Sequence, residues 1–315
     1  MLTKILIVDK VHESLPAQLE AQGIVCEVNR NLTYDDFVAL PDEYAGLIIR
    51  SRFVVDKKAL LSKPSLRFVI RIGSGVESID TEFAERCGVR VLSTPEGNAP
   101  SVAQHALGLL LAALRHIVEA DKEVRCGEWL REKNKGRELG SLTVGIIGYG
   151  HTGPAFARLL APFGCKIYAY DKFKSGFGSD EVTEAPLLTL LQECDVLSLH
   201  INYLPENHYF INKDIINQAK RPFIFINTSR GLAVNTADVV EGLKSGKISY
   251  ACLDVLEYED VRLKNAAKEE WQEPMRQLAE MENVILTPHI AGQTTDAERR
   301  HAEVAFEKIM KVLKS

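Results

Sequence analysis

The chain alternates short apolar runs with longer segments in which apolar residues recur every three or four positions. The short runs are rich in Val and Ile and are apolar at successive positions, which predicts strands buried on both faces. The longer segments predict helices, as in residues 296–313. Strands of this kind separated by helices indicate an α/β protein whose parallel sheets are covered by helices. The predicted strands are Ile5–Val8, Leu47–Ile49, Phe68–Ile70, Val89–Leu92, Val144–Ile147, Ile167–Tyr170, Val196–Leu199, Phe223–Ile226, Ala251–Val255 and Val284–Leu286.

A long helix is predicted from Ser101 to Cys126, and it divides the chain. Ser101 follows Pro100 and is a suitable N-cap. Four of the predicted strands precede this helix and six follow it. Residues 127–140 are polar and predict a surface crossing before the next strand. The pattern therefore predicts two domains.

Length and composition agree with two domains and exclude several classes of protein. A chain of 315 residues is long enough for two separate cores. A net charge of −5 argues against a nucleic-acid partner, which requires a basic surface. The longest apolar run, Ala106–Leu114, is about half of what a membrane span needs. The six cysteines are dispersed, so we expect reduced thiols, no metal site and a cytoplasmic protein without membrane contact.

A glycine-rich loop follows the predicted strand at Leu142–Ile147 and precedes a predicted helix at Ala155–Leu160. In a GxGxxG loop the first glycine permits a tight turn and the second lets the backbone approach a pyrophosphate. The third lets the helix pack on the strand. Phosphates then bind the free N–H groups at the start of the helix. The predicted pyrophosphate-binding residues are Gly148, Gly150, His151, Thr152 and Gly153.

Asp171 ends the next predicted strand, 23 positions after Gly148. A carboxylate at this place accepts hydrogen bonds from the hydroxyls of an adenosine ribose. It would also repel a 2′-phosphate, so NAD is favoured over NADP. Together with the glycine-rich loop, Asp171 predicts a dinucleotide site.

Three polar segments follow predicted strands at their C-terminal ends, where open α/β sheets bind ligands. These segments are Asn227–Gly231, Leu253–Glu259 and Thr287–Gly292. They supply an arginine, several carboxylates and a histidine. A histidine can gain or lose a proton near neutral pH, a neighbouring carboxylate favours its charged form, and an arginine can bind a carboxylate in bidentate geometry.

The chain resembles the D-isomer-specific 2-hydroxyacid dehydrogenase family over nearly its whole length. The resemblance rests on SVAQHALGLLLAALR, on the glycine-rich loop with Asp171, and on SLH, NTSRG, LDVLEYE and TPHIAG. It implies that Arg230 binds the carboxylate and carbonyl of the substrate. It also implies that His289 is the acid/base, Glu259 its partner, and Asp254 a contact of the nicotinamide amide. Further cofactor contacts implied by the family motifs are His200, Thr228 and Gly292.

The carboxylate that pairs with His289 has three candidates. Where the family often has Pro after its catalytic Glu, this chain has Asp260, so Glu257, Glu259 and Asp260 compete for the role. The spacing favours Glu259, which lies five positions after Asp254.

The resemblance also implies how the two doubly wound parallel-sheet domains are divided. A flavodoxin-like substrate domain is expected from residues 1–100 and 288–315, and a Rossmann NAD domain from residues 101–287. The substrate is expected in a cleft between them, and the helix at 101–126 is expected to form a homodimer. Because the chain ends after the last predicted helix, no C-terminal regulatory domain is expected.

Arginines at adjacent strand ends predict a second anionic group on the substrate. Arg50 and Arg52 follow one strand and Arg71 ends the next. Arginine clusters suit phosphate, although one of Arg50 and Arg52 can merely be solvated. IIRSR and VIRIGSG resemble 3-phosphoglycerate dehydrogenases, which begin serine synthesis. The predicted substrate-binding residues are Arg50, Ser51, Arg52, Arg71, Ser74, Gly75 and Asn98.

The predicted function is therefore NAD-dependent interconversion of a D-2-hydroxy acid and its 2-oxo acid, with 3-phosphoglycerate as the expected hydroxy acid. The alternative is a glyoxylate/hydroxypyruvate reductase or another D-2-hydroxyacid dehydrogenase. A remote alternative is an NAD-sensing binding scaffold. It is disfavoured because nothing outside the enzyme core is expected to recruit partners.

Overall fold

The computed structural model describes residues 3–259 and 270–314. The chain forms two compact units: unit 1 is Met1–Ala99 with Gln293–Ser315, and unit 2 is Pro100–Gly292. The boundaries predicted from the sequence follow residues 100 and 287. The structure groups residues 288–292 with unit 2, because the backbone at Ile290 and Ala291 is hydrogen-bonded to Asp254.

Five strands in the described part of unit 1 form a parallel sheet in the order β2-β1-β3-β4-β5. This is the flavodoxin-like order. The strands are β1 (Lys4–Ile7), β2 (Val25–Val28), β3 (Gly46–Ile49), β4 (Phe68–Arg71) and β5 (Arg90–Ser93). The helices are α1 (Ser14–Glu20), α2 (Tyr34–Ala39), α3 (Lys57–Leu61), α4 (Thr81–Arg86) and α12 (Thr295–Lys314).

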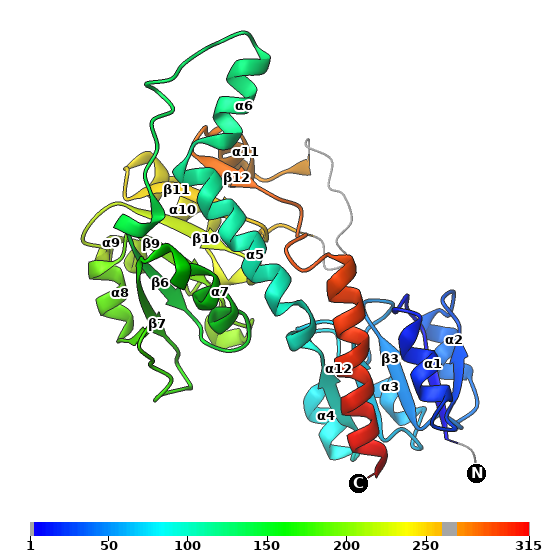
Figure 1. Cartoon of the computed structure of the whole chain (residues 1–315). Coiled ribbons are helices and arrows are strands. Elements are labelled where there is room, and N and C mark those ends of the chain that lie inside the picture. The colour runs from blue at the N-terminus through cyan, green and yellow to red at the C-terminus, as the bar shows by residue number, and fades with distance from the viewer. Residues whose placement is uncertain (1–2, 260–269, 315) are drawn as a thin grey trace. The chain divides into compact units, whose positions relative to one another are not determined.

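The unit 1 sheet has an apolar layer on each face. Ile5 and Ile7 point to one layer, which α1 and α12 cover, and Leu6 and Val8 point to the other, which α2, α3 and α4 cover. Figure 1 shows α12 lying along α1, although the two helices stand at opposite ends of the sequence. The alternation along β1 explains why its residues are apolar at every position.

Seven strands in the described part of unit 2 form a second parallel sheet, in the order β12-β11-β10-β9-β6-β7-β8. The strands are β6 (Thr143–Ile147), β7 (Lys166–Tyr170), β8 (Thr183–Glu184), β9 (Val196–Leu199), β10 (Phe223–Asn227), β11 (Ile248–Leu253) and β12 (Val284–Leu286). The helices are α5 (Pro95–Leu114), α6 (Ile117–Arg125), α7 (Thr152–Leu160), α8 (Leu187–Glu193), α9 (Lys213–Gln218), α10 (Thr236–Lys244) and α11 (Glu273–Glu280). The strand order reverses between β6 and β9, which is where such sheets bind dinucleotides. The predicted fold class of two doubly wound parallel sheets is confirmed.

The sequence pattern missed two strands, β2 and β8. Both lie at the edge of a sheet, and most of their residues are exposed. An edge strand that is not buried on both faces lacks the continuous apolar run that identified the others. Five strands therefore precede α5, where four were predicted.

The predicted single helix from Ser101 to Cys126 is wrong. The helix α5 begins earlier, at Pro95, and contains Pro100. It ends at Leu114, and His116 takes a left-handed conformation with φ of 50° before α6 begins. The two helices meet at a bend of 60°. No single described helix is long and apolar enough to cross a membrane, and α5 and α6 pass that test only as a bent pair.

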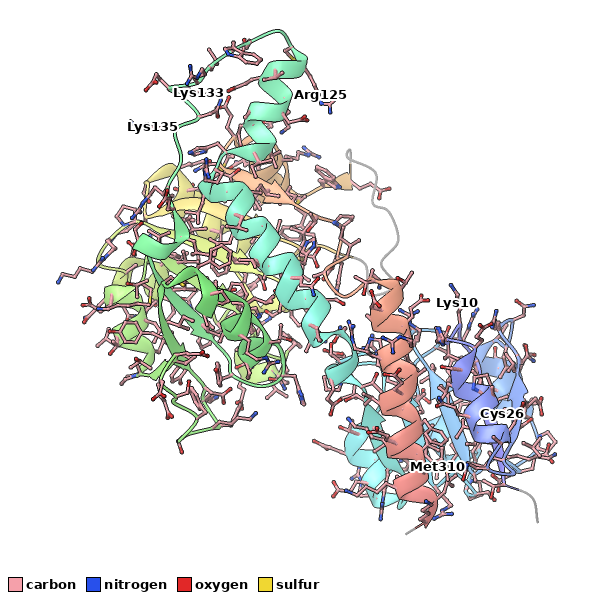
Figure 2. All side chains as sticks on the ribbon, in the orientation of Figure 1. Lys10, Cys26, Arg125, Lys133, Lys135 and Met310 are labelled. Atoms are coloured by element: carbon pink, nitrogen blue, oxygen red, sulfur yellow. The ribbon has the colours of Figure 1, made fainter. Side chains whose placement is uncertain are left out.

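An arm formed by α6 and the following segment extends from unit 2, where Arg125, Lys133 and Lys135 are labelled in Figure 2. Lys133 is paired with Glu123 at 2.9 Å within this arm. The arm also exposes large apolar side chains, and Trp129 is 74% exposed.

Candidate active site

The glycine-rich loop follows β6, and its three glycines do different things. A Cβ on Gly148 would lie 2.6 Å from the carbonyl oxygen of His200, and φ of Gly148 is +96°. A Cβ on Gly153 would lie 2.3 Å from the carbonyl oxygen of Gly148. A Cβ on Gly150 would meet no described atom within 4 Å. The first and third glycines are therefore required by packing, and the second leaves the loop open to a ligand.

Asp171 holds the same loop from the end of β7. Its Oδ2 accepts a hydrogen bond from the Tyr149 N–H at 2.7 Å, and its Oδ1 accepts from the N–H groups of Phe173 and Lys174. The Lys174 ammonium in turn donates to the carbonyl oxygens of Tyr149 and Gly150. The carboxylate thus stands beside the loop, as a ribose-binding acid must.

The start of α7 presents backbone N–H groups beside the loop. His151 is the N-cap, and its side chain makes no capping hydrogen bond to the described helix. Thr152 is the first residue of α7. This helix end can therefore bind an anion through its N–H groups.

Two buried polar atoms on the neighbouring strand ends lack a hydrogen-bond partner among the described residues: His200 Nδ1 and Thr228 Oγ1. His200 follows β9, and its Nε2 lies 2.8 Å from Ser198 Oγ. Burial lowers the pKa of His200 to about 3, so the ring is neutral. Orphaned buried polar atoms are rare in folded proteins, and here they fit a polar ligand at the predicted dinucleotide site.

Arg230 lies in a loop that Asn227 ties together at the end of β10. The Asn227 side chain accepts hydrogen bonds from the N–H and hydroxyl of Ser229, and it donates to the Arg230 carbonyl at 3.1 Å. The Arg230 guanidinium donates to the Ser229 carbonyl at 2.8 Å. A Cβ on Gly231 would lie 1.9 Å from the carbonyl oxygen of Leu256, so this loop packs directly on the segment that follows β11.

His289 and Glu259 form the histidine–carboxylate pair. His289 Nδ1 lies 3.0 Å from Glu259 Oε2. Among the described residues, His289 Nε2 makes no hydrogen bond, so this nitrogen can face a substrate. The backbone of His289 is left-handed, with φ of +54°. Non-glycine residues held in this region often lie at functional sites.

Of the three carboxylates that competed for His289, Glu257 is engaged elsewhere. Its Oε1 accepts from the Tyr209 hydroxyl at 2.5 Å, and its Oε2 accepts from the Thr236 N–H at 2.9 Å. Asp260 lies outside the described residues. The geometry therefore favours Glu259, as the spacing does.

Asp254 anchors the segment that carries His289. It is 1% exposed, and its carboxylate accepts hydrogen bonds from the Thr287 hydroxyl and from the N–H groups of Ile290 and Ala291. Burial alone raises the pKa of Asp254, but hydrogen bonds from His105, Thr287 and the two N–H groups outweigh burial, so its pKa lies below the usual value. Gly292 follows directly and is the last residue of unit 2. Contact of Asp254 and Gly292 with a nicotinamide remains a prediction.

Sequence reasoning gave no role to His105, which belongs to this network. Its Nε2 lies 3.0 Å from Thr287 Oγ1 and 3.4 Å from Asp254 Oδ1. His105 lies within α5, 182 positions from Thr287, and inside an apolar helical pattern. The only sign of His105 in the sequence is a polar residue within the apolar pattern of this helix.

In unit 1, Asp9 holds the loop that carries the first two predicted substrate arginines. Its Oδ2 accepts hydrogen bonds from the N–H groups of Arg50, Ser51 and Arg52, at 2.6 to 3.1 Å. The Arg52 guanidinium turns back, donating to the Val8 carbonyl at 3.1 Å and lying 3.4 Å from Asp9 Oδ1. The Arg50 guanidinium makes no hydrogen bond or ion pair with the described residues, so the side chains of Arg50 and Arg52 differ in their contacts.

Arg71 supports the glycine loop of unit 1. Its guanidinium donates to the carbonyl oxygens of Arg50 and Gly75, at 3.1 and 3.0 Å. Ser74, in the same loop, is exposed, and Asn98 is half-buried in the first turns of α5. Six of the seven predicted substrate residues therefore lie at the ends of β3 and β4, whereas Asn98 belongs to α5.

His301 is a second residue that sequence reasoning missed, and it lies beside these arginines. Its Nδ1 lies 2.7 Å from the Thr94 hydroxyl. The pKa of His301 is lowered to about 4, chiefly by burial and to a smaller extent by the positive charges of Arg50, Arg300 and Arg71.

Comparison with known proteins identifies relatives of both units. Residues 107–291 match the sequence profile of a family described as "D-isomer specific 2-hydroxyacid dehydrogenase, NAD binding domain". The chain is 34% identical over 310 residues to a hydroxypyruvate reductase of Thermotoga maritima, an alignment that covers 96% of this chain and 98% of that protein.

Two further comparisons bear on length and fold. A D-3-phosphoglycerate dehydrogenase of Archaeoglobus fulgidus is 31% identical over 313 residues. That alignment covers 99% of this chain but 57% of the relative, so the chain spans little more than half of its length. The crystal structure of a D-lactate dehydrogenase from Aquifex aeolicus with NAD and lactic acid is similar, with a TM-score of 0.82 and 25% identity. It covers 99% of this chain and 96% of the other.

Proposed function

The chain belongs to the D-isomer-specific 2-hydroxyacid dehydrogenase family, with residues 107–291 as its NAD-binding domain, and from this premise we propose that it interconverts a D-2-hydroxy acid and its 2-oxo acid. The observation that carries the proposal is the His289–Glu259 pair. At 3.0 Å, the pair leaves His289 Nε2 available to the substrate oxygen. Arg230, on the loop that packs against the Glu259 segment, supplies the cation for the substrate carboxylate.

Each step assigns a task to a residue of this chain. Bound NADH supplies the hydride for the reduction. Arg230 holds the carboxylate of the 2-oxo acid and stabilises negative charge on its carbonyl oxygen. Protonated His289 donates the Nε2 proton to that oxygen, and Glu259 stabilises the charged ring before the transfer. In the oxidation, neutral His289 removes the hydroxyl proton.

The cofactor contacts follow from the loop geometry. Gly150 leaves room for the pyrophosphate beside the N–H groups at the start of α7. Asp171 accepts hydrogen bonds from the ribose hydroxyls and disfavours a 2′-phosphate. The unpartnered atoms His200 Nδ1 and Thr228 Oγ1 gain a polar partner when the dinucleotide is bound.

For the substrate we propose 3-phosphoglycerate and 3-phosphohydroxypyruvate, the pair that begins serine synthesis. The support is the placement of Arg50 directly after β3 and of Arg71 at the end of the neighbouring β4, both close enough to His301 for their charges to lower its pKa. Arg50 has its guanidinium uncommitted within the described residues and is the first candidate for the phosphate. The similarity to the Archaeoglobus enzyme agrees with this choice.

The second candidate is hydroxypyruvate or glyoxylate, without a phosphate. The observation that favours it is the pairing of Arg52 with Asp9, which removes one arginine from the proposed phosphate cluster. The similarity to the Thermotoga hydroxypyruvate reductase agrees with this alternative.

We also propose that the protein is a homodimer through α5, α6 and the arm that follows. Ile117, Val124, Trp129 and Leu130 expose apolar surface there, and a second copy would cover it. Sedimentation at the mass of two chains supports the dimer. A monomer of 35.1 kDa at micromolar concentration contradicts it.

The test of the substrate is NADH oxidation with phosphohydroxypyruvate, hydroxypyruvate, glyoxylate and pyruvate, repeated with Arg50→Ala. A selective loss of phosphohydroxypyruvate reduction in the variant supports the phosphate proposal, and an equal loss for all four contradicts it. NADH binding without turnover of any 2-oxo acid would point to the binding scaffold instead.

The test of the chemistry is His289→Ala. We expect kcat to fall by about 10²–10⁴-fold, because proton transfer contributes about this much. The Kd for NADH, measured by fluorescence in the absence of substrate, should change little. Near-normal turnover would remove His289 from the mechanism.

A further inference from the structure

The segment from Thr287 to Ala291 wraps around the Asp254 carboxylate. The carboxylate accepts the Thr287 hydroxyl at 2.6 Å and the N–H groups of Ile290 and Ala291 at 2.9 Å each. The Asp254 carbonyl oxygen accepts the His289 N–H at 2.7 Å. Four consecutive contacts from one buried residue therefore fix the backbone on both sides of the catalytic histidine.

The proton positions in this network follow from its geometry. Thr287 has a single hydroxyl hydrogen, and an ionised carboxylate 2.6 Å away can only accept it. The Thr287 oxygen therefore acts as an acceptor toward His105 Nε2 at 3.0 Å. It follows that His105 carries its hydrogen on Nε2, pointing at Thr287 Oγ1 and, at 3.4 Å, at Asp254 Oδ1.

This arrangement keeps charge at a place where charge is costly. Asp254 is almost fully buried, and an ionised carboxylate there depends on the donors that surround it. His105 is the donor that comes from another element, the helix α5. The remaining donors belong to the segment that Asp254 itself has to hold. Without His105, the carboxylate keeps, among the described residues, only the donors of the segment that it holds.

The backbone of His289 makes this support matter for the reaction. A non-glycine residue with φ of +54° is conformationally strained and stays in this region only when its surroundings hold it there. The hydrogen bonds from the Ile290 and His289 N–H groups to Asp254 hold the backbone of His289 in this conformation. Loosening them lets the ring leave the Glu259 carboxylate, and a misplacement of about 1 Å can cost about 10²-fold in rate.

We propose that His105 is a positioning residue for the reaction, acting through Thr287 and Asp254 on the catalytic His289. It does so by donating its Nε2 hydrogen to Thr287 Oγ1, which orients the hydroxyl toward Asp254. The proposal rests on the proposed function, because His289 is catalytic only if that function is correct.

The test compares four variants of the whole enzyme. His105→Leu removes the donor, and His105→Gln restores an N–H group at a similar reach. Thr287→Val removes the hydroxyl and keeps the shape of the side chain. Gln104→Ala is the matched control, because Gln104 is the exposed neighbour on the same helix.

With the best 2-oxo acid, we expect kcat to fall by about 10-fold in His105→Leu and to return to within about 3-fold of the wild type in His105→Gln. The Kd for NADH should stay within about 2-fold in all variants. The double variant His105→Leu/Thr287→Val should have the same kcat as the more impaired of the two single variants, because the two residues act through the same series of hydrogen bonds. Gln104→Ala should match the wild type.

Hydrogen exchange without cofactor or substrate gives a readout that does not depend on turnover. The amides of Ile290 and Ala291 should exchange faster in His105→Leu, by about 10-fold, and regain protection in His105→Gln. Equal kcat and equal exchange in the wild type and His105→Leu would overturn the proposal. So would multiplicative losses in the double variant. If the wild type reduces no 2-oxo acid, the proposed function fails, whereas the exchange experiment still decides whether His105 holds the segment.

Discussion

Each unit places a buried aspartate at a strand end and uses it to hold the loop of a neighbouring strand. In unit 1, Asp9 follows β1 and accepts three N–H groups from the loop after β3. In unit 2, Asp254 follows β11 and accepts two N–H groups and a hydroxyl from the segment after β12. The two loops carry the proposed substrate arginines and the proposed catalytic histidine.

The two aspartates differ in the side chain that stabilises their negative charge. Asp9 is 8% exposed and faces Arg52, a member of the loop that it holds. Asp254 faces His105, which belongs to a distant helix and makes no contact with substrate in the proposed mechanism. Unit 1 therefore uses one of its candidate substrate cations, Arg52, to stabilise its own loop, whereas unit 2 uses a histidine that has no direct part in the proposed reaction.

The threonine–histidine pairs show a second contrast. In unit 2, Thr287 donates to a carboxylate and accepts from His105. In unit 1, Thr94 Oγ1 accepts from the Gly73 N–H at 2.9 Å and lies 2.7 Å from His301 Nδ1, and the hydroxyl can still either donate to this ring or accept from it. The geometry therefore places a hydrogen on His105 Nε2, whereas it is compatible with either tautomer of His301.

The largest expected effect is that of Asp254→Asn. An amide cannot accept all of the donors around it, so we expect the free energy of unfolding to fall by about 2–4 kcal/mol and kcat by about 10²-fold. Urea denaturation and steady-state kinetics measure the two. Asp195→Asn is the control in the same unit, because Asp195 accepts the Thr143 N–H away from the site. If kcat falls as much in the control as in Asp254→Asn, then Asp254 has no specific role in holding the catalytic segment.

The next effect is the pH dependence of unit 1 that His301 causes. Its pKa is about 4 in the folded protein and about 6.5 in the unfolded chain, so the unfolded state binds the extra proton between these values. The His301 contribution is fully present above pH 6.5 and is lost as the pH falls toward 4. We expect the free energy of unfolding to fall by up to about 3 kcal/mol between pH 7 and pH 4. Urea denaturation followed by circular dichroism measures this loss of stability, and the loss should be smaller in His301→Gln. If the free energy of unfolding depends on pH as strongly in that variant as in the wild type, His301 is not its cause.

A smaller effect is expected for Asp9→Asn. Three N–H groups lose part of their acceptor, and the arginine loop becomes less ordered. We expect KM for the 2-oxo acid to rise by about 10-fold, while kcat stays within about 3-fold, because the loop binds and does not transfer a proton. If kcat falls by a larger factor than KM rises, then Asp9 supports the chemical step, as Asp254 does, and not only substrate binding.

The smallest effect is expected for Arg52→Gln. Its guanidinium is already paired with Asp9 and the Val8 carbonyl, and it is partly exposed. We expect KM for phosphohydroxypyruvate to rise by no more than about 3-fold. A rise as large as that of Arg50→Ala would show that both arginines bind the substrate anion.

The sequence predicted the elements that repeat a simple pattern. Buried parallel strands such as β6 and β9 are apolar throughout, and the glycine-rich loop, Arg230, Glu259 and His289 stand in recognisable motifs. Edge strands lack that pattern, and the left-handed His116 that separates α5 from α6 has no signature in an apolar helix. Both are decided by tertiary packing.

The supporting residues of the site were harder to find than the reacting ones. Asp9, His105 and His301 act through contacts with residues 41 to 207 positions away. Each looks like an ordinary strand-end or helix residue when the chain is read in order. Only the folded structure brings their partners within hydrogen-bond distance.

The place of α12 in unit 1 has a consequence for how the protein is made. Ala302, Ala305 and Ile309 of this helix complete the apolar layer over β1 and β4, yet they are synthesised after all of unit 2. During translation, residues 1–99 therefore emerge with one face of their sheet covered by α1 alone until the last helix is made, while unit 2 can fold as soon as its own residues have left the ribosome. We therefore expect unit 1 to be completed after unit 2, the reverse of the usual order in which the N-terminal domain folds first.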